Sequence, residues 1–280
     1  MGVWLALVAA LSYGVGDFVG GVGGRRTEPA LIPIGIQTVG LVAALVAVAV
    51  LPGNGPIVGA LSWGAISGIG SGIGNAALFR GFARGQMSVV APLSAVLTAA
   101  LPVVVGLVTG DRLSPFGWAG LVLALPAIFL VSWSGAAGFR PADLGYGLPA
   151  GGGFGLLFIA LDRAGTEHGA WPLLPGQLVA LLVALAAAIP VLRRPRYRRW
   201  QPWAGVLRWS VSAGLLGAAA NYCFLAATGA GQLTIAAVLA GLYPAVTVLL
   251  AMLILRERPR LAQAAGLVGA GAAVVAMAAG

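Results

Sequence analysis

Long apolar runs separated by short polar or charged gaps are the main pattern of the chain. Ten runs can be marked, with ends good to a few residues: 2–22, 30–51, 58–80, 87–109, 115–134, 144–162, 171–192, 205–227, 232–254 and 261–279. Most of them have the ~17–25 residues that an α-helix needs to cross a bilayer. Because backbone polar groups inside lipid must be satisfied within the segment, the pattern predicts an all-α membrane protein with ten transmembrane helices.

The composition agrees with a membrane location. Hydrophobic residues make up 60% of the 280 residues and charged residues only 8%, against about 25% in soluble domains. The net charge of +9 comes from 16 arginines, since the chain has no lysine, and they lie in the gaps between apolar runs. Basic residues in such gaps orient a membrane protein, so nucleic acid is not an expected partner. The first run has no basic segment before it and is expected to be retained rather than cleaved as a signal peptide.

The second half of the chain repeats the layout of the first half at an offset of 146 residues. The matched residues are Asn75 with Asn221, Gly85-Gln86 with Gly231-Gln232, Asp111-Arg112 with Glu257-Arg258, and Ala119-Gly120-Leu121-Val122 with Ala265-Gly266-Leu267-Val268. We therefore expect two copies of one five-helix unit, 1–134 and 143–280. Five crossings are an odd number, so the copies must be inverted relative to each other, an architecture typical of transporters.

The arginines predict the orientation. If the N-terminus is outside the cell, the gaps after the odd-numbered runs face the cytoplasm, and the positive-inside rule favours this arrangement with both termini outside. Only Arg112 and Arg163 then lie on the outer side. The cytoplasmic side has the other fourteen: Arg25, Arg26, Arg80, Arg84, Arg140, Arg193, Arg194, Arg196, Arg198, Arg199, Arg208, Arg256, Arg258 and Arg260.

Small residues recur every four positions in two of the runs. The third run has Ala60, Gly64, Gly68, Gly72 and Ala76, and the first has Gly16, Gly20 and Gly24. Such spacing places the small residues on one helix face and lets two helix backbones approach closely. The alternative is that glycine is common in membrane helices and that part of the spacing arises by chance.

Two segments of the second half resemble the repeat of the EamA family, within the drug/metabolite transporter superfamily. They are Leu242-Tyr-Pro-Ala-Val-Thr-Val-Leu-Leu250 and Leu255-Arg-Glu-Arg-Pro-Arg-Leu-Ala-Gln-Ala-Ala-Gly266. Ala10-Leu-Ser-Tyr-Gly14 and Gly110-Asp-Arg-Leu-Ser114 resemble it in the first half. The resemblance implies a ten-helix secondary carrier with a central cavity that moves small metabolites, often by export. The chain departs from the family pattern at Asp111, where glutamate is usual.

Asp17 is the most informative single residue. It lies well inside the first run, with Tyr13 one turn earlier on the same face. An ionisable group within a span is costly and is a functional candidate by default. Its carboxylate could bind a cationic group or exchange a proton during turnover. The alternative is a structural ion pair with Arg25, Arg26 or Arg80.

Polar side chains at corresponding places in the two halves are further candidates for substrate contact. These are Asn75 and Asn221, which match in the repeat, and Gln37 and Gln177. Buried amides must find a partner, and bonding between helices is the alternative. Tyr222 and Phe79 are candidates for cavity walls, with packing against lipid as the alternative. Pro244 breaks the ninth run beside Tyr243, and Thr98, its counterpart in the fourth run, is expected to face the same cavity; a simple kink is the alternative.

Other chemistry finds no support in the sequence. There is one histidine, and metal-ligand spacing, nucleophile–base pairs and phosphate-binding loops are missing, so no metal or cofactor is expected. Cys223 is the only cysteine, which excludes an intrachain disulfide. His168 lies in a polar gap beside Glu167 and is expected to be solvated. The run from Arg193 to Trp200 is expected to anchor the chain at anionic lipid headgroups.

These observations favour a secondary transporter in the plasma membrane, with a small polar or amphipathic solute such as an amino acid or an amine as substrate. Membrane lipids and protons are the other expected partners, and one chain is sufficient, since both repeats are present in it. The alternatives are a channel or regulatory subunit, and a lipid-modifying enzyme. A channel would show a filter or rings of charge, and an enzyme would show clustered acids or histidines; the sequence has neither.

Overall fold

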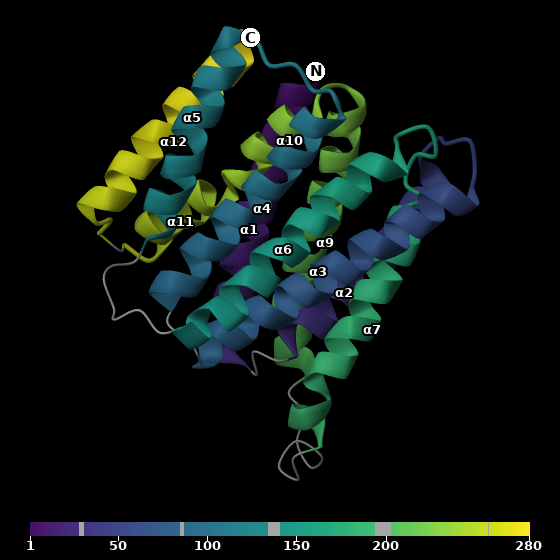
Figure 1. Cartoon of the computed structure of the whole chain (residues 1–280). Helices are drawn as coiled ribbons and strands as arrows, with labels where there is room; N and C mark the ends of the chain where they lie inside the picture. The colour runs from purple at the N-terminus through teal and green to yellow at the C-terminus, as the bar shows by residue number, and fades with distance from the viewer. Residues whose placement is uncertain (28–30, 85–86, 134–140, 194–202, 257) are drawn as a thin grey trace.

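The structure is a computed structural model, and among the residues that it describes the regular secondary structure is helical (Figure 1). It describes the chain except for 28–30, 85–86, 134–140, 194–202 and 257, and except for the side chains of 79, 82–84, 87–88 and 203. The predicted lipid anchor therefore lies outside the described residues apart from Arg193. The helices are α1 (Gly2–Arg26), α2 (Ile32–Val50), α3 (Val58–Arg84), α4 (Met87–Thr109), α5 (Pro115–Ser132), α6 (Pro141–Ala164), α7 (Leu173–Leu192), α9 (Trp203–Gly229), α10 (Leu233–Gly241), α11 (Tyr243–Ile254) and α12 (Leu261–Ala279).

Most of the helices can cross a membrane. Within the described ranges, nine spans are long and apolar enough, with α10 and α11 together forming one of them. The remaining helix, α3, has 27 residues and is about 40 Å long at 1.5 Å per residue. It is less apolar because it carries glycines and the polar residues Ser67, Ser71 and Asn75. The predicted ten-helix membrane fold is confirmed. Helix α3 is the one of these helices that is too polar to count as a span by its composition alone.

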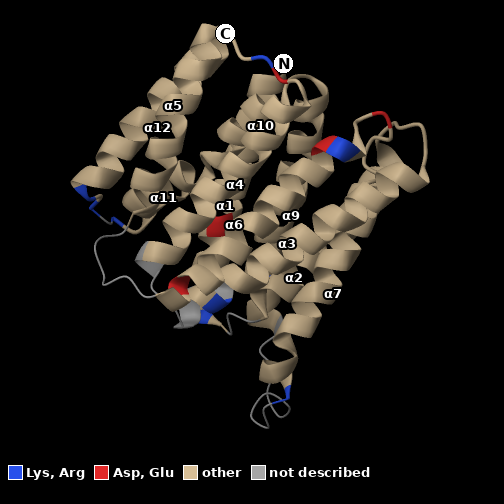
Figure 2. Cartoon of the chain, viewed as in Figure 1, with Lys and Arg blue, Asp and Glu red and all other residues tan. Residues whose placement is uncertain are grey.

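Charged residues gather at the two ends of the bundle. Both chain termini lie at the upper end in Figure 1, and most basic segments lie at the lower end in Figure 2. We call the lower one the arginine end and the upper one the terminal end. This separation is what the sequence pattern predicted, because successive helices run in opposite directions.

The two halves of the chain interlock instead of forming separate bodies. The most extensive helix contacts join one half to the other: α3 with α6 and α7, α1 with α9, α2 with α9, α4 with α6 and α10, and α5 with α12. Neighbours in the chain, such as α1 and α2, touch little. Exchanging the two halves maps this contact pattern onto itself, since α1 with α9 corresponds to α6 with α3. Each half therefore relies on the other to cover its helix faces.

Glycines allow the closest of these contacts. A Cβ added to Gly64 would lie 2.0 Å from the carbonyl oxygen of Pro172, and one added to Gly68 would lie 2.2 Å from that of Gly176. At Gly72 it would meet the side chain of Val183 at 2.5 Å. The predicted stripe of small residues in α3 thus packs on α7, backbone against backbone.

The ninth span is broken where the sequence predicted it. Helix α10 ends at Gly241, and α11 begins at Tyr243 with Pro244 in its first turn. Proline suits a helix start because its missing N–H would have no partner there. Helix α4, the counterpart in the first half, is continuous although it contains Pro92 and Pro102. The two halves therefore differ at this position.

Gly68→Ala should destabilise the protein by about 1–3 kcal/mol, since the added methyl group overlaps a backbone carbonyl that cannot rotate away. The measurement is the midpoint of thermal unfolding of the purified protein in detergent, followed by circular dichroism.

Gly152→Ala in α6 is the matched control. Nothing lies within 4 Å of its added Cβ, and alanine favours the helix by about 1 kcal/mol, so this variant should keep or raise the midpoint. Equal midpoints for the two variants would contradict the close contact of α3 with α7.

Candidate substrate-binding site

The centre of the bundle is a contact between α1 of the first half and α9 and α11 of the second. The hydroxyl of Tyr13 donates a hydrogen bond to Oδ1 of Asn221 at 2.5 Å. The Tyr13 ring also lies edge-on to Tyr243, with centroids 6.3 Å apart and planes at 62°. Three residues that the sequence proposed as candidates are thus brought together from three different helices.

Aromatic packing fills the side of this centre toward the terminal end. Phe158 of α6 and Phe224 of α9 stack with ring centroids 4.1 Å apart, and both side chains are buried. Tyr13 lies 5.9 Å from Phe158. Stacked rings in van der Waals contact leave no passage between them, so this pair obstructs the centre in this direction.

Hydrogen bonds between turns hold the terminal end together. The carboxylate of Asp111, after α4, accepts a bond of 2.8 Å from the backbone N–H of Thr234 at the start of α10. A carboxylate at a helix N-terminus also interacts favourably with the helix dipole. The Gln232 side-chain amide donates to the carbonyl oxygen of Arg112 at 2.8 Å. Gln86 and Glu257, their counterparts in the repeat, lie outside the described residues.

Asp17 lies on the interior face of α1 and is nevertheless accessible. The helix positions 6, 10, 13 and 17 are separated by four, three and four residues, so Ala6, Ala10, Tyr13 and Asp17 lie on one face of α1. Both alanines are buried, whereas Trp4, Val8 and Leu11 on the opposite face are exposed. Protein atoms surround the Asp17 carboxylate on all sides at a distance, but the atoms in direct contact leave its side chain exposed. The carboxylate therefore borders an open space inside the bundle.

Two glycines border the same space. Gly217 lies in the middle of the buried face of α9, between Ala213 and Phe224, but a Cβ added to it would meet nothing within 4 Å. The same holds for Gly21, one turn from Asp17 toward the end of α1 at Arg26. Gly217 is next to α1, since its backbone nitrogen lies 3.9 Å from the Cβ position of Gly16. Both glycines thus have open room beside them, and both lie toward the arginine end from the Tyr13–Asn221 bond.

Asp17 makes no hydrogen bond or ion pair with any residue that the structure describes. Arg80, one of the partners weighed from the sequence, donates instead to the carbonyl oxygen of Ala187 at 3.2 Å. The guanidinium of Arg26 stacks over the ring of Trp209, 5.3 Å from its centroid. The structural ion pair that was the alternative role for Asp17 is therefore not present among the described residues.

The amide side chains surround a second point, on the side of α3. Ser71 receives bonds of 3.4 Å on its hydroxyl from Gln37 and from Asn75, and Asn75 also donates to the Ser71 carbonyl oxygen at 2.9 Å. Gln177 and Asn221 line a small cavity of about 10 Å³ beside Ser71, room for about one water molecule. Asn221 thus connects this amide cluster to Tyr13.

The remaining candidates lie elsewhere or cannot be placed. Thr98 is buried in α4 and its hydroxyl donates to the Ser94 carbonyl oxygen at 2.8 Å. Tyr222 is half-buried against the apolar core. Phe79 belongs to α3, but its side chain lies outside the described part of the chain. Phe158, Phe224 and Ser71 were not proposed from the sequence, because apolar rings and serines are frequent in membrane helices.

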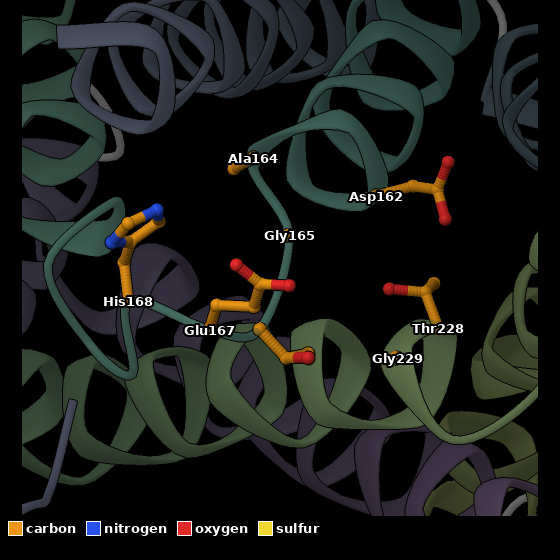
Figure 3. Close-up of a pocket in the computed structure, with 8 residues that line it drawn as sticks. Asp162, Ala164, Gly165, Glu167, His168, Thr228 and Gly229 are labelled. Carbon is orange, nitrogen blue, oxygen red and sulfur yellow. The ribbon is translucent and has the colours of Figure 1, made fainter. Parts of the chain in front are cut away.

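A larger cavity, of about 250 Å³, lies at the terminal end between the end of α6, the loop after it and the end of α9 (Figure 3). Asp162, Glu167 and Thr228 line it. His168 is half-buried, with Nδ1 3.0 Å from the carbonyl oxygen of Gly55, so it is held by the protein and is not merely solvated. All of this lining belongs to the second half. No group of three or more described His, Cys, Asp or Glu side chains is placed to bind a metal ion.

The Tyr13–Asn221 bond should be measurable as a coupling between the two residues. We expect Tyr13→Phe and Asn221→Ala to be non-additive in the free energy of unfolding by about 0.5–3 kcal/mol, since either change leaves the other group without its partner. Tyr222→Phe is the control, because the Tyr222 hydroxyl makes no bond within the described residues, and it should cost less than about 0.5 kcal/mol. Additive effects would contradict the bond.

Comparison with known proteins agrees with this architecture. A crystal structure whose title calls it only a protein is 18% identical, and the alignment covers 99% of this chain and 98% of that one with a TM-score of 0.75. This likeness shows that the two share a fold. No curated protein matches the chain.

A family model identifies the second half more closely. The model described as the EamA-like transporter family matches residues 144–279. This range runs from α6 to the end of α12 and contains both segments on which the resemblance was based. The chain is thus a multi-pass membrane protein whose residues 144–279 match the EamA-like transporter family, which belongs to the drug/metabolite transporter superfamily.

Proposed function

We propose that the protein is a secondary carrier that moves a small polar or amphipathic metabolite by alternating access between two inverted five-helix repeats, 1–134 and 143–280. The inverted arrangement is supported by the contact pattern, which maps onto itself when the halves are exchanged. The family match supports transport as the activity.

One observation carries the proposal: an accessible carboxylate, which has no partner among the described residues, lies at the contact between the halves, with packed rings and bonds on its terminal-end side. Toward the terminal end, the Phe158–Phe224 stack and the Asp111–Thr234 bond close the path. Toward the arginine end, Gly21 and Gly217 have open room beside their backbones, which supports access from that side. A carrier needs such one-sided access in each of its states, whereas an open channel does not.

The arginine distribution favours an orientation with the arginine end in the cytoplasm and both termini outside, and we propose the plasma membrane as the location. In this orientation the solute enters from the cytoplasm, which is the direction of export that the family resemblance implies. Opening to the outside would require the aromatic stack and the bonds between turns to separate. The two bonds join turns of different halves, so a rocking motion between the halves can break them. Phe158 and Phe224 both belong to the second half, so their stack would have to open by a movement of α6 against α9.

Asp17 is proposed to couple transport to protons. It is the only acidic residue among the described residues of α1, and it lies on the path. A protonated carboxyl is much less costly in a closed, dehydrated centre than an ionised one. Proton uptake and release would therefore favour different states of the carrier.

In proteoliposomes, the wild-type protein should show saturable counterflow of a labelled solute chosen from a panel of amino acids, amines, nucleosides and sugars. A pH gradient should accelerate its accumulation, and Asp17→Asn should abolish this acceleration because the proton site is lost. Accumulation at several external pH values measures the effect.

Asp162→Asn, in the cavity at the terminal end, is the control and should keep the response to the gradient. Flux that rises linearly with solute concentration would argue against a carrier and for a channel. An unchanged pH response of Asp17→Asn would remove Asp17 from the coupling.

The orientation can be tested by cysteine labelling in a Cys223→Ser background. Asn54→Cys, in the loop between α2 and α3, should react with an impermeant maleimide added to intact cells. Arg258→Cys, in the turn before α12, should react only after the cells are opened. Both positions are exposed, so accessibility within the protein is matched. Labelling of both from the same side would contradict the proposed orientation.

A further inference from the structure

We propose that the central site selects substrates with one positive charge beside an apolar or aromatic body, such as primary monoamines, over amino acids and carboxylates. The inference rests on the proposed carrier function and specifies its substrate class. It follows from the charge and the ring surfaces that the described residues place around Asp17.

The first element is an uncompensated negative charge. Asp17 has no hydrogen-bond or ion-pair partner among the described residues, and it is close enough to Tyr13 and Tyr243 to act on both electrostatically. An ionised carboxylate away from bulk water is costly unless it is paired. A substrate ammonium group would supply the missing pair.

The second element is a corner formed by two aromatic rings. Tyr13 and Tyr243 meet at 62° with centroids 6.3 Å apart, and both side chains are only half-buried. Ring faces attract cations, and they also pack against apolar or aromatic groups. A carboxylate beside two accessible rings therefore suits an ammonium group that is attached to an apolar body.

The third element is the charge that the centre does not offer. Arg25, the basic residue of α1 nearest to Asp17, is eight residues away, about 12 Å along the helix axis, and Arg80 is bonded to the Ala187 carbonyl oxygen. The other polar groups near the centre are neutral: Asn221, Ser71 and the glutamines. The carboxylate of an amino acid would find no cation there among the described residues, and would also be repelled by Asp17.

Two matched series of ligands isolate the effect of charge. In the first, 2-phenylethylamine, phenylalanine and 3-phenylpropionate share one skeleton; in the second, butylamine, norvaline and pentanoate do. Binding to the purified wild-type protein in detergent is measured by isothermal titration calorimetry. In at least one series the amine should bind about tenfold or more tightly than the amino acid, and the carboxylate should not bind measurably.

Variants connect this preference to Asp17. Asp17→Asn should weaken amine binding by about tenfold or more, and Asp17→Glu should retain the order amine, amino acid, carboxylate. Asp162→Asn tests the acid-lined cavity at the terminal end and should leave amine affinity within about twofold. The wild-type series needs no variant, so the test holds even if Asp17→Asn does not fold.

The inference is overturned if neither amine binds, if in both series the amino acid or the carboxylate binds as tightly as its matched amine, or if Asp162→Asn rather than Asp17→Asn abolishes amine binding. Counterflow of the same labelled ligands distinguishes a wrong substrate class from a wrong transport mechanism. Saturable exchange of phenylalanine without exchange of the amine would refute the substrate class and leave the carrier intact. Flux without saturation would refute the carrier.

Discussion

Close approach of helix backbones from opposite halves is the constraint on which the rest of the structure depends. In lipid, apolar side chains gain little by leaving their surroundings, so helices associate through van der Waals packing and polar bonds. Gly64 and Gly68 of α3 allow contact with the backbone of α7, and Gly70 and Gly153 bring α3 equally close to α6. These contacts fix α3 in the centre, where its serines and Asn75 can meet the amides of other helices.

This way of packing also explains why the polar groups gather where the halves meet. A polar side chain that faced lipid would have no partner, whereas one between the halves can bond across them, as Tyr13 does with Asn221. The same interface has to change if a solute is to pass. Structural bonding and proposed substrate contact therefore involve neighbouring groups, and Asn221 takes part in both the tyrosine contact and the small cavity.

The two sides of the centre differ in how they are packed. At the terminal end, stacked rings and directional hydrogen bonds define one closed geometry. Toward the arginine end, Gly21 and Gly217 have open room beside their backbones. Asp17 lies between these two regions and lacks a partner among the described residues. An uncompensated charge in such a place adds nothing to folding that a neutral residue could not supply, which is why it is assigned to function.

The sequence by itself determined the features that depend on local geometry. Apolar length predicted the spans, four-residue spacing predicted the packing stripe of α3, and Pro244 predicted the break between α10 and α11, because helix period and the missing proline N–H act within a few residues. Only the tertiary structure decided which groups meet. It paired Phe158 with Phe224, bonded Thr98 to its own helix in the core and left Asp17 open to interior space. The partner of a helix face is set by helices that are distant in the sequence, and no local pattern encodes that choice.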